Sequence, residues 1–205
     1  MTPKIEYFFS SVSPWSYLGH DLFIESAARH GAEIVYKPVN LGLVFPETGG
    51  LPLPKRAPAR QKYRLVELKR WKEKRGLPLN LQPAHFPTDC TLADCCVIAI
   101  VEAGGDPAGF LGRAYRAVWT YDRDVADEHV VEGLLADAGQ DAHAILAAAK
   151  SDAVKAIYAA NAREAIDKSV FGAPTYILAG EPFWGQDRLD LLEDALSSGR
   201  APYTA

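Results

Sequence analysis

The chain has 205 residues, of which 48% are hydrophobic and 23% are charged, an ordinary composition for a soluble globular protein. A formal net charge of −4 gives no broad basic surface, which argues against a nucleic-acid-binding protein, and no apolar run reaches the roughly 20 residues that a membrane-spanning helix needs. The three cysteines include no CxxC pair, which argues against a disulfide scaffold.

The first forty residues predict a strand, a helix and a second strand. Residues 4–9 and 33–39 are rich in β-branched and aromatic side chains, whereas the apolar residues between them recur at helical spacing until Gly31. A strand, a helix and a strand over about 35 residues fit a βαβ unit with parallel strands. Because the chain enters this pattern without an apolar signal segment, we expect a cytoplasmic protein.

The middle of the chain is predicted to be mostly helical. Residues 41–58 hold four prolines and three glycines and are predicted to form a long loop, of a length typical of functional or mobile segments. A helix is predicted over 59–75, with Tyr63, Val66 and Leu68 among its apolar positions and a very basic remaining face. Further helices are expected near 89–103, 107–121, 127–138, 141–149 and 152–168.

Strand patterns return only near the end of the chain. Residues 175–178 and 182–184 predict a hairpin, and a last helix follows it. We therefore predict an α/β protein with a thioredoxin-like fold that carries an inserted all-helical domain. The thioredoxin-like domain is expected to comprise residues 1–40 and 169–205, and the inserted helical domain residues 41–168.

The junction between the first strand and the first helix, Ser13-Pro14-Trp15-Ser16, is the main candidate for a functional site. Serine followed by proline is typical of a helix start, where free N–H groups and the helix dipole favour an anion. Thioredoxin-like redox proteins carry Cys-Pro-x-Cys at this junction, whereas here Ser13 and Ser16 occupy both sulfur positions. We interpret the site as one that stabilises a thiolate supplied by another molecule. The alternative for Ser13 is an ordinary helix cap.

A second feature, Ala173-Pro174, directly precedes the third predicted strand. In thioredoxin-like folds a cis-proline at this place lies beside the helix start, and the backbone of the preceding residue pairs with a bound peptide. The alternative is a trans proline that opens a strand, since only about 5–6% of X–Pro bonds are cis.

Three segments together resemble a known family. They are Ser13-Pro14-Trp15-Ser16-Tyr17-Leu18, Phe171-Gly172-Ala173-Pro174-Thr175-Tyr176 and Phe183-Trp184-Gly185-Gln186-Asp187-Arg188-Leu189. In this order they resemble the 2-hydroxychromene-2-carboxylate isomerases and the related kappa-class glutathione transferases, and the resemblance covers nearly the full chain. It implies a homodimeric, glutathione-dependent cis–trans isomerase of aromatic-compound catabolism, such as naphthalene degradation. The substrate would be 2-hydroxychromene-2-carboxylate or a similar intermediate, and the product trans-o-hydroxybenzylidenepyruvate.

The resemblance also implies roles for individual residues. Ser13 matches the catalytic serine, whose hydroxyl donates a hydrogen bond to the glutathione sulfur. The residues that would bind glutathione are Ala173, Pro174, Gln186, Asp187, Arg60 and Lys62. Trp15 and Trp184 would line the pocket of the small aromatic substrate.

Several of these residues have a plainer alternative. Asp187 also suits the cap of the last helix. Arg60 and Lys62 would otherwise belong to a solvated basic face, which also includes Arg56, Arg64, Lys69 and Arg70. The histidines show no metal-ligand spacing, so no metal is expected. Cys90, Cys95 and Cys96 are expected to be small core residues.

Two other functions stay open from the sequence. One is a glutathione transferase or peroxidase that acts on electrophiles, as in the kappa class. The other is a non-catalytic domain that binds glutathione or thiol peptides. A dithiol oxidoreductase is disfavoured, because Ser13 and Ser16 cannot form a disulfide.

Overall fold

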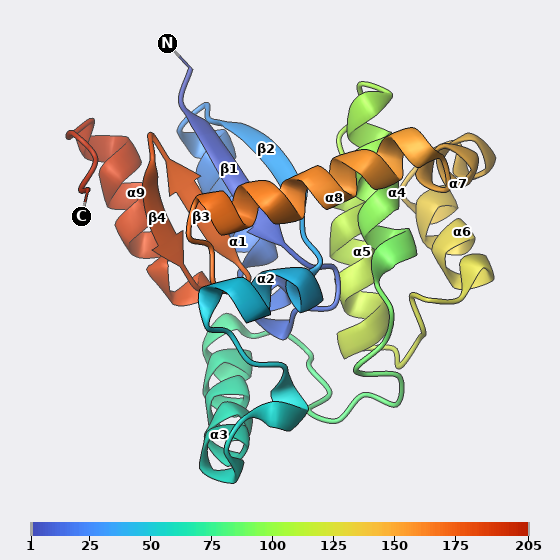
Figure 1. The fold of residues 1–205 in the computed structure, drawn as a ribbon, viewed down its shortest axis with the longest axis horizontal. Coiled ribbons are helices and arrows are strands. Elements are labelled where there is room, and N and C mark those ends of the chain that lie inside the picture. Colours follow the sequence, from blue (N-terminus) through green and yellow to red (C-terminus); the bar gives the residue numbers. More distant parts are fainter. Residues whose placement is uncertain (1, 205) are drawn as a thin grey trace.

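The computed structural model describes residues 2–204 and places a four-stranded sheet between layers of helices (Figure 1). The strands are β1 (Lys4–Phe9), β2 (Glu33–Pro38), β3 (Thr175–Leu178) and β4 (Glu181–Trp184). The α-helices are α1 (Pro14–Arg29), α2 (Leu41–Thr48), α3 (Pro58–Arg75), α4 (Thr91–Glu102), α5 (Ala108–Trp119), α6 (Glu128–Asp137), α7 (Ala142–Ala149), α8 (Asp152–Asp167) and α9 (Leu189–Ser198). Two short 3-10 helices are η1 (Leu53–Lys55) and η2 (Gln186–Arg188).

The sheet has the strand order β2-β1-β3-β4. β1 runs parallel to β2, as the predicted βαβ unit requires, and antiparallel to β3, which forms an antiparallel hairpin with β4. The predicted βαβ unit and the predicted hairpin are both confirmed, and so is the α/β fold with a thioredoxin-like sheet.

Each face of β1 belongs to a different core, because successive side chains of a strand point to opposite faces. Tyr7 lies on the face that α1 and α9 cover, where its ring stacks on Tyr176 with a centroid distance of 5.2 Å. Its hydroxyl lies 3.2 Å from that of Tyr115 on α5, so this core continues into the helical part of the chain. Phe8 points to the other face, where it packs with Val44 of α2 and Ala162 of α8.

The predicted loop over 41–58 is wrong in its first half, which forms α2. The Asn40 side chain accepts a hydrogen bond of 2.9 Å from the Gly42 amide and caps this helix, which buries Val44 and packs against α8. The prolines and glycines suggested a loop, but Pro46 is tolerated in this short helix and Gly49, with φ of 78°, ends it. Tertiary packing of the apolar face therefore outweighs the local composition.

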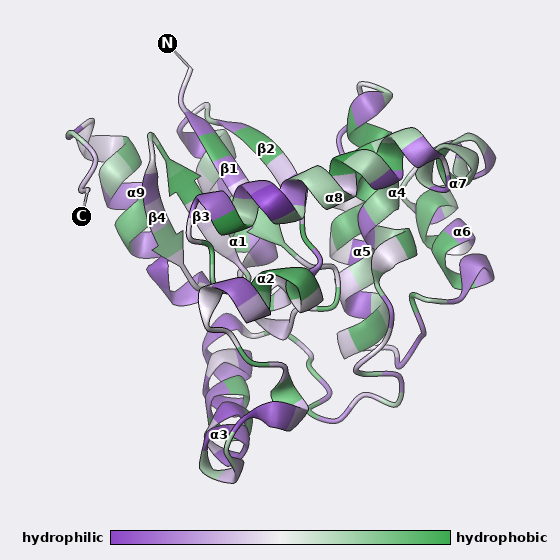
Figure 2. Cartoon of the chain, viewed as in Figure 1, coloured by the Kyte–Doolittle hydropathy of each residue, from purple (hydrophilic) through white to green (hydrophobic). Residues whose placement is uncertain are grey.

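Helix α3 was predicted correctly in extent but not in its burial. It projects away from the sheet and is mostly hydrophilic (Figures 1 and 2). Tyr63 and Val66, predicted as apolar contacts, are 60% and 42% exposed, whereas Arg64 is buried together with Leu68. The face of α3 that turns inward is therefore partly basic.

The helical segment 41–168 is joined to the sheet by packing and hydrogen bonds. Both α4 and α8 contact β2, and the Asn161 side-chain amide of α8 donates to the Pro38 carbonyl at 3.1 Å. The predicted division into two domains stays a prediction, and its outermost residues, 1 and 205, lie outside the described part. Within residues 2–204 no helix combines the length and apolar character that crossing a membrane requires.

Candidate active site

Ser13 stands at the start of α1, in the turn that follows β1. Its backbone is extended, with φ of −77° and ψ of 121°, and Pro14 occupies the first helical position. The Ser13 hydroxyl oxygen accepts a hydrogen bond of 3.2 Å from the Ser16 amide, which is the arrangement of a helix cap. Among residues 2–204 the Trp15 amide donates to no acceptor, so one N–H group of the first turn stays available to a ligand.

The segment before β3 meets this helix start. The Ala173–Pro174 peptide bond is cis, as predicted, and the Ser13 hydroxyl donates to the Ala173 carbonyl at 3.3 Å. In the part of the chain that the structure describes, the Ala173 amide makes no hydrogen bond. The Ser13 hydroxyl therefore meets the Ala173 carbonyl, and the free amides of Trp15 and Ala173 belong to the two segments that this contact joins.

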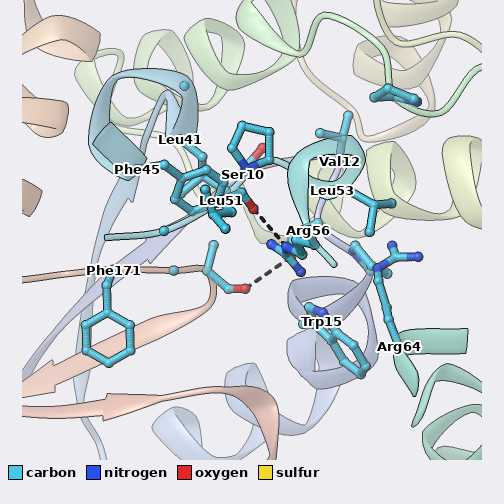
Figure 3. Close-up of a pocket in the computed structure, with 18 of the residues that line it drawn as sticks. Ser10, Val12, Trp15, Leu41, Phe45, Leu51, Leu53, Arg56, Arg64 and Phe171 are labelled. Atoms are coloured by element: carbon cyan, nitrogen blue, oxygen red, sulfur yellow. Dashed lines mark hydrogen bonds between the residues drawn. The ribbon is translucent and has the colours of Figure 1, made fainter. Parts of the chain in front are cut away.

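This point lies in a large open cleft of about 1140 Å3. Its walls come from the turn before α1, from α2 and η1, from the first half of α3, from residues 86–91 and from the segments around Ala173 and Gln186 (Figure 3). Pockets for a single small ligand usually measure roughly 300–1,000 Å3. The cleft is therefore large enough for a peptide-sized cofactor and a second small molecule.

Most of the site residues predicted from the sequence line this cleft. They are Ser13, Trp15, Arg60, Ala173, Trp184, Gln186 and Asp187. Lys62 is exposed on α3 and is not part of the lining, so the structure does not bring it to the others. Pro174 is buried behind Ala173 and also lies outside the lining. The roles of all these residues stay predictions.

Trp184 and Phe171 form an exposed aromatic wall beside Ala173. Their rings meet edge to face with a centroid distance of 4.7 Å. Gly172 lies against the indole, since a Cβ atom at this residue would come within 2.5 Å of the Trp184 Nε1 atom. Any side chain at position 172 would displace the tryptophan from this wall.

Gln186 has a partner that sequence analysis missed. The guanidinium of Arg75, at the end of α3, donates to the Gln186 side-chain oxygen at 2.9 and 2.8 Å and to its backbone carbonyl at 3.1 Å. Asp187 is exposed and pairs with Arg188 at 3.1 Å. Hydrogen bonds from α3 thus hold the turn at Gln186 and Asp187, which was predicted to bind one end of glutathione.

The part of the cleft that is lined by η1, its C-terminal neighbour Arg56 and the first half of α3 is basic. Arg56, Arg60 and Arg64 line it. The sequence assigned Arg60 to glutathione binding by resemblance and left open the alternative of a solvated basic face that also includes Arg56 and Arg64. That alternative does not hold for Arg64, which is only 9% exposed. Burial and then the nearby charge of Arg56 lower the pKa of Arg64 to about 10, and burial and then Arg60 lower the pKa of Arg56.

A buried carboxylate lies behind the turn that carries Ser13. Asp94 of α4 accepts hydrogen bonds of 2.9 Å from the Ser11 amide and of 2.9 Å from the Tyr158 hydroxyl. Burial raises the pKa of Asp94 to about 6. The carboxylate therefore ties the helical segment to the turn, and no sequence pattern pointed to this link.

Cys90 differs from its expected place in the core. Cys95 and Cys96 are buried, but Cys90 precedes α4, lines the cleft and lies with its sulfur 3.3 Å from the Ser10 hydroxyl. Burial, followed by the nearby Asp94, raises the pKa of the Cys90 thiol well above its usual range. This cysteine is therefore held as a protonated thiol and is a poor nucleophile. Within residues 2–204 no group of three or more potential ligands is arranged to hold a metal ion.

Known proteins share this architecture and its length. A 2-hydroxychromene-2-carboxylate isomerase of Sphingobium xenophagum is 31% identical over 198 residues, which cover 96% of this chain and 99% of that protein. Glutathione S-transferase kappa 1 of Caenorhabditis elegans is 27% identical over 95% of this chain and 91% of that protein. A solved structure of a 2-hydroxychromene-2-carboxylate isomerase superposes with a TM-score of 0.81, at 27% identity and with 95% of each chain covered.

The match to a family described as the DSBA-like thioredoxin domain extends over residues 4–197, which include the whole sheet and every segment of the cleft. The chain therefore belongs to the DSBA-like thioredoxin domain family and to the family of 2-hydroxychromene-2-carboxylate isomerases.

Proposed function

We propose that the protein is a glutathione-dependent isomerase that acts on 2-hydroxychromene-2-carboxylate or a similar intermediate of aromatic-compound degradation. The observation that carries this proposal is the Ser13 hydroxyl at the start of α1, beside the free amides of Trp15 and Ala173. Such a site stabilises a thiolate, yet the cysteine that lines the cleft is held as a thiol. The reactive sulfur would therefore come from a ligand.

The residues present fit glutathione in this cleft. When bound, glutathione would supply the thiolate that adds to the conjugated double bond of the substrate; with the hemiketal C–O bond of the ring opened to a ketone and a phenol, the former double bond could rotate, and loss of the thiolate would restore the double bond in the trans form. Ser13 would turn its hydroxyl from the Ala173 carbonyl to the sulfur, and the free Ala173 amide would bind the ligand backbone. Asp187 would pair with the ammonium group of the γ-glutamyl end, and Arg60 with a carboxylate. Trp15 and Trp184 would contact the aromatic substrate.

The test compares Ser13→Ala with the wild type. Thiolate formation by bound glutathione is measured from its ultraviolet absorbance, and isomerisation is measured with and without glutathione. We expect Ser13→Ala to lose most of the thiolate signal and most of the activity, because the remaining groups are backbone amides alone. Removing one donor of this kind typically lowers turnover by about 100-fold or more.

Ser151→Ala is the matched control, because Ser151 caps α8 by accepting a hydrogen bond of 3.3 Å from the Val154 amide. Both changes remove a helix cap, which costs about 1 kcal/mol of unfolding free energy, but only the change at Ser13 should affect the thiolate. Equal isomerisation rates with and without glutathione would contradict the proposed role of glutathione.

The second candidate is a glutathione transferase, which the similarity to the C. elegans kappa protein favours. A transferase consumes glutathione and accumulates a conjugate, whereas the isomerase returns glutathione after each turnover. Mass spectrometry of the reaction products distinguishes the two activities.

Two further properties belong to this proposal. We propose action in the cytoplasm, where the free thiols of Cys90, Cys95 and Cys96 would stay reduced. We also propose a homodimer, which the family resemblance implies and which sedimentation measurements would test.

A further inference from the structure

We propose that Arg56 and Arg64 form a carboxylate subsite that holds the acidic group of the second substrate, apart from the thiolate site at Ser13. This proposal rests on the proposed function, because it assigns the place of the molecule that glutathione would attack. It also predicts the chemical class of that molecule, a planar conjugated or aromatic acid.

Arg64 is a buried cation without a partner. Its side chain lines the cleft, is 9% exposed and donates no hydrogen bond to any acceptor in residues 2–204. The guanidinium lies over the ring of Phe86 at 5.5 Å from the centroid, which orients it without neutralising its charge. A buried charge is costly unless it is paired. An anionic ligand would provide the missing partner.

Arg56 adds a second guanidinium to the same place. Its Nε donates to the Leu51 carbonyl at 2.7 Å, which fixes the side chain and leaves both terminal nitrogens available. Arg56 is near enough for its charge to lower the pKa of Arg64. Two like charges held together repel each other, and a carboxylate between them would remove that repulsion.

In the described residues, no acidic residue of the cleft pairs with Arg56 or Arg64. Glu67 pairs with Arg70, Asp187 pairs with Arg188, and Asp89 accepts a hydrogen bond from the Thr91 amide. They are the acids that line the cleft in the described part of the chain. The guanidinium groups of Arg56 and Arg64 therefore have no acidic partner among the acids that line the cleft.

The surroundings of the two arginines indicate the rest of the ligand. In Figure 3 Arg64 lies on the side of Trp15 and Leu53, and Arg56 lies between Arg64 and Leu51. Phe86 adds a further ring beside Arg64. A flat apolar body that carries one carboxylate fits this combination, whereas the polar backbone of a tripeptide fits the Ala173 side, where a free amide and a carbonyl lie.

The experiment compares an acid with an analogue that lacks the acid. The pair is 2-hydroxychromene-2-carboxylate and 2-hydroxy-2-methylchromene, in which a methyl group replaces the carboxylate. Relative kcat/KM values are measured for the wild type, Arg64→Gln and Arg56→Gln at saturating glutathione. We expect Arg64→Gln to lower the preference for the acid about 10- to 100-fold, mainly through KM, since a charge-assisted contact has about this value. Lys69→Gln, an exposed change on the same helix, is the matched control and should leave the preference unchanged.

Binding measurements separate this proposal from the proposed function. Calorimetry follows the binding of trans-o-hydroxybenzylidenepyruvate and of its methyl-ketone analogue, and separately the binding of glutathione. We expect Arg64→Gln to weaken the binding of the acid at least tenfold and to leave the affinity for glutathione within about twofold of the wild-type value. If the wild type binds the acid through Arg64 but isomerises nothing, the proposed function fails and the subsite stands.

Three results would overturn the subsite. They are an unchanged acid preference in Arg64→Gln, a loss of glutathione binding as large as the loss of acid binding, and equal affinity of the wild type for the acid and its methyl ketone. The last comparison needs no variant, so the proposal stays testable even if Arg64→Gln does not fold.

Discussion

At position 13 a single hydroxyl both caps a helix and bonds across to the segment before β3. A thiol in this place would be larger, a weaker hydrogen-bond donor and itself reactive. Serine therefore suits a site in which the sulfur belongs to a ligand. The neighbouring Ser16 is fully buried, lies outside the cleft and contributes only its amide to this arrangement.

The buried Asp94 predicts a particular pH dependence of stability. Its pKa is about 6 in the folded chain, above the ordinary value of 3.8, because burial disfavours the carboxylate. Between these values the folded protein keeps a proton that the unfolded chain has lost, so this group's contribution to stability falls as pH rises from about 4 to about 6 and is constant above that range. The total change is about 3 kcal/mol.

Urea unfolding of the wild type and Asp94→Asn at pH 4 and pH 7 measures this contribution. The difference between the two proteins should shift by up to about 3 kcal/mol in favour of Asp94→Asn on going from pH 4 to pH 7. Asp167→Asn, the same substitution at an exposed position of α8, is the matched control. A pH-independent difference for Asp94→Asn would contradict the raised pKa.

The residues of the site differ in how well the sequence predicts them. The structure places Ser13 and Ala173 in contact. Both were predicted as site residues with the help of a local signal, a proline after a helix cap and a proline before a strand. Asp94 and Arg64 were not, because a charged residue in a helix is expected at the surface. The burial of Asp94 depends on Ser11, which is 83 positions away in the chain. Local patterns carry no information about such contacts.

At the scale of elements, the boundaries of most helices and strands followed from hydrophobic spacing and from glycines at helix ends, such as Gly31 after α1 and Gly76 after α3, both of which have positive φ. Helix α2 was missed because its packing against α8 cannot be seen in its own eight residues. The position of α3 could not be predicted from the sequence either. The helix buries only Arg64 and Leu68, and contacts such as that of Arg75 with Gln186, rather than a broad apolar face, hold it in place.

The contact between Arg75 and Gln186 predicts how α3 is kept in place. Arg75→Met keeps the aliphatic stem but removes the hydrogen bonds to the Gln186 side chain and backbone, so we expect faster hydrogen exchange in α3 and in residues 186–188. The unfolding free energy should fall by about 1–3 kcal/mol. Lys69→Met removes a basic side chain from an exposed position of the same helix and should leave the exchange pattern unchanged.

At the scale of the whole molecule, the sheet and the helical segment share one core. Tyr7 of β1 contacts Tyr115 of α5 through their hydroxyl groups, and α4 and α8 both pack against β2. We therefore expect a single cooperative unfolding transition rather than two. Calorimetry tests this, because the calorimetric and van't Hoff enthalpies should agree. A well-separated second transition would show that residues 41–168 unfold on their own.

Two hydrogen bonds to distant residues hold the turn before α1, one from the Ser11 amide to Asp94 and one from the Ser13 hydroxyl to the Ala173 carbonyl. The conformation of residues 10–13 thus depends on two distant parts of the chain, α4 in the middle and the segment before β3 near the C-terminus. For protein engineering this means that the arrangement around Ser13 cannot be transplanted as a short peptide graft. A chimera that exchanges the helical segment would keep the shape of this turn only if the incoming sequence also brought an acceptor for the Ser11 amide.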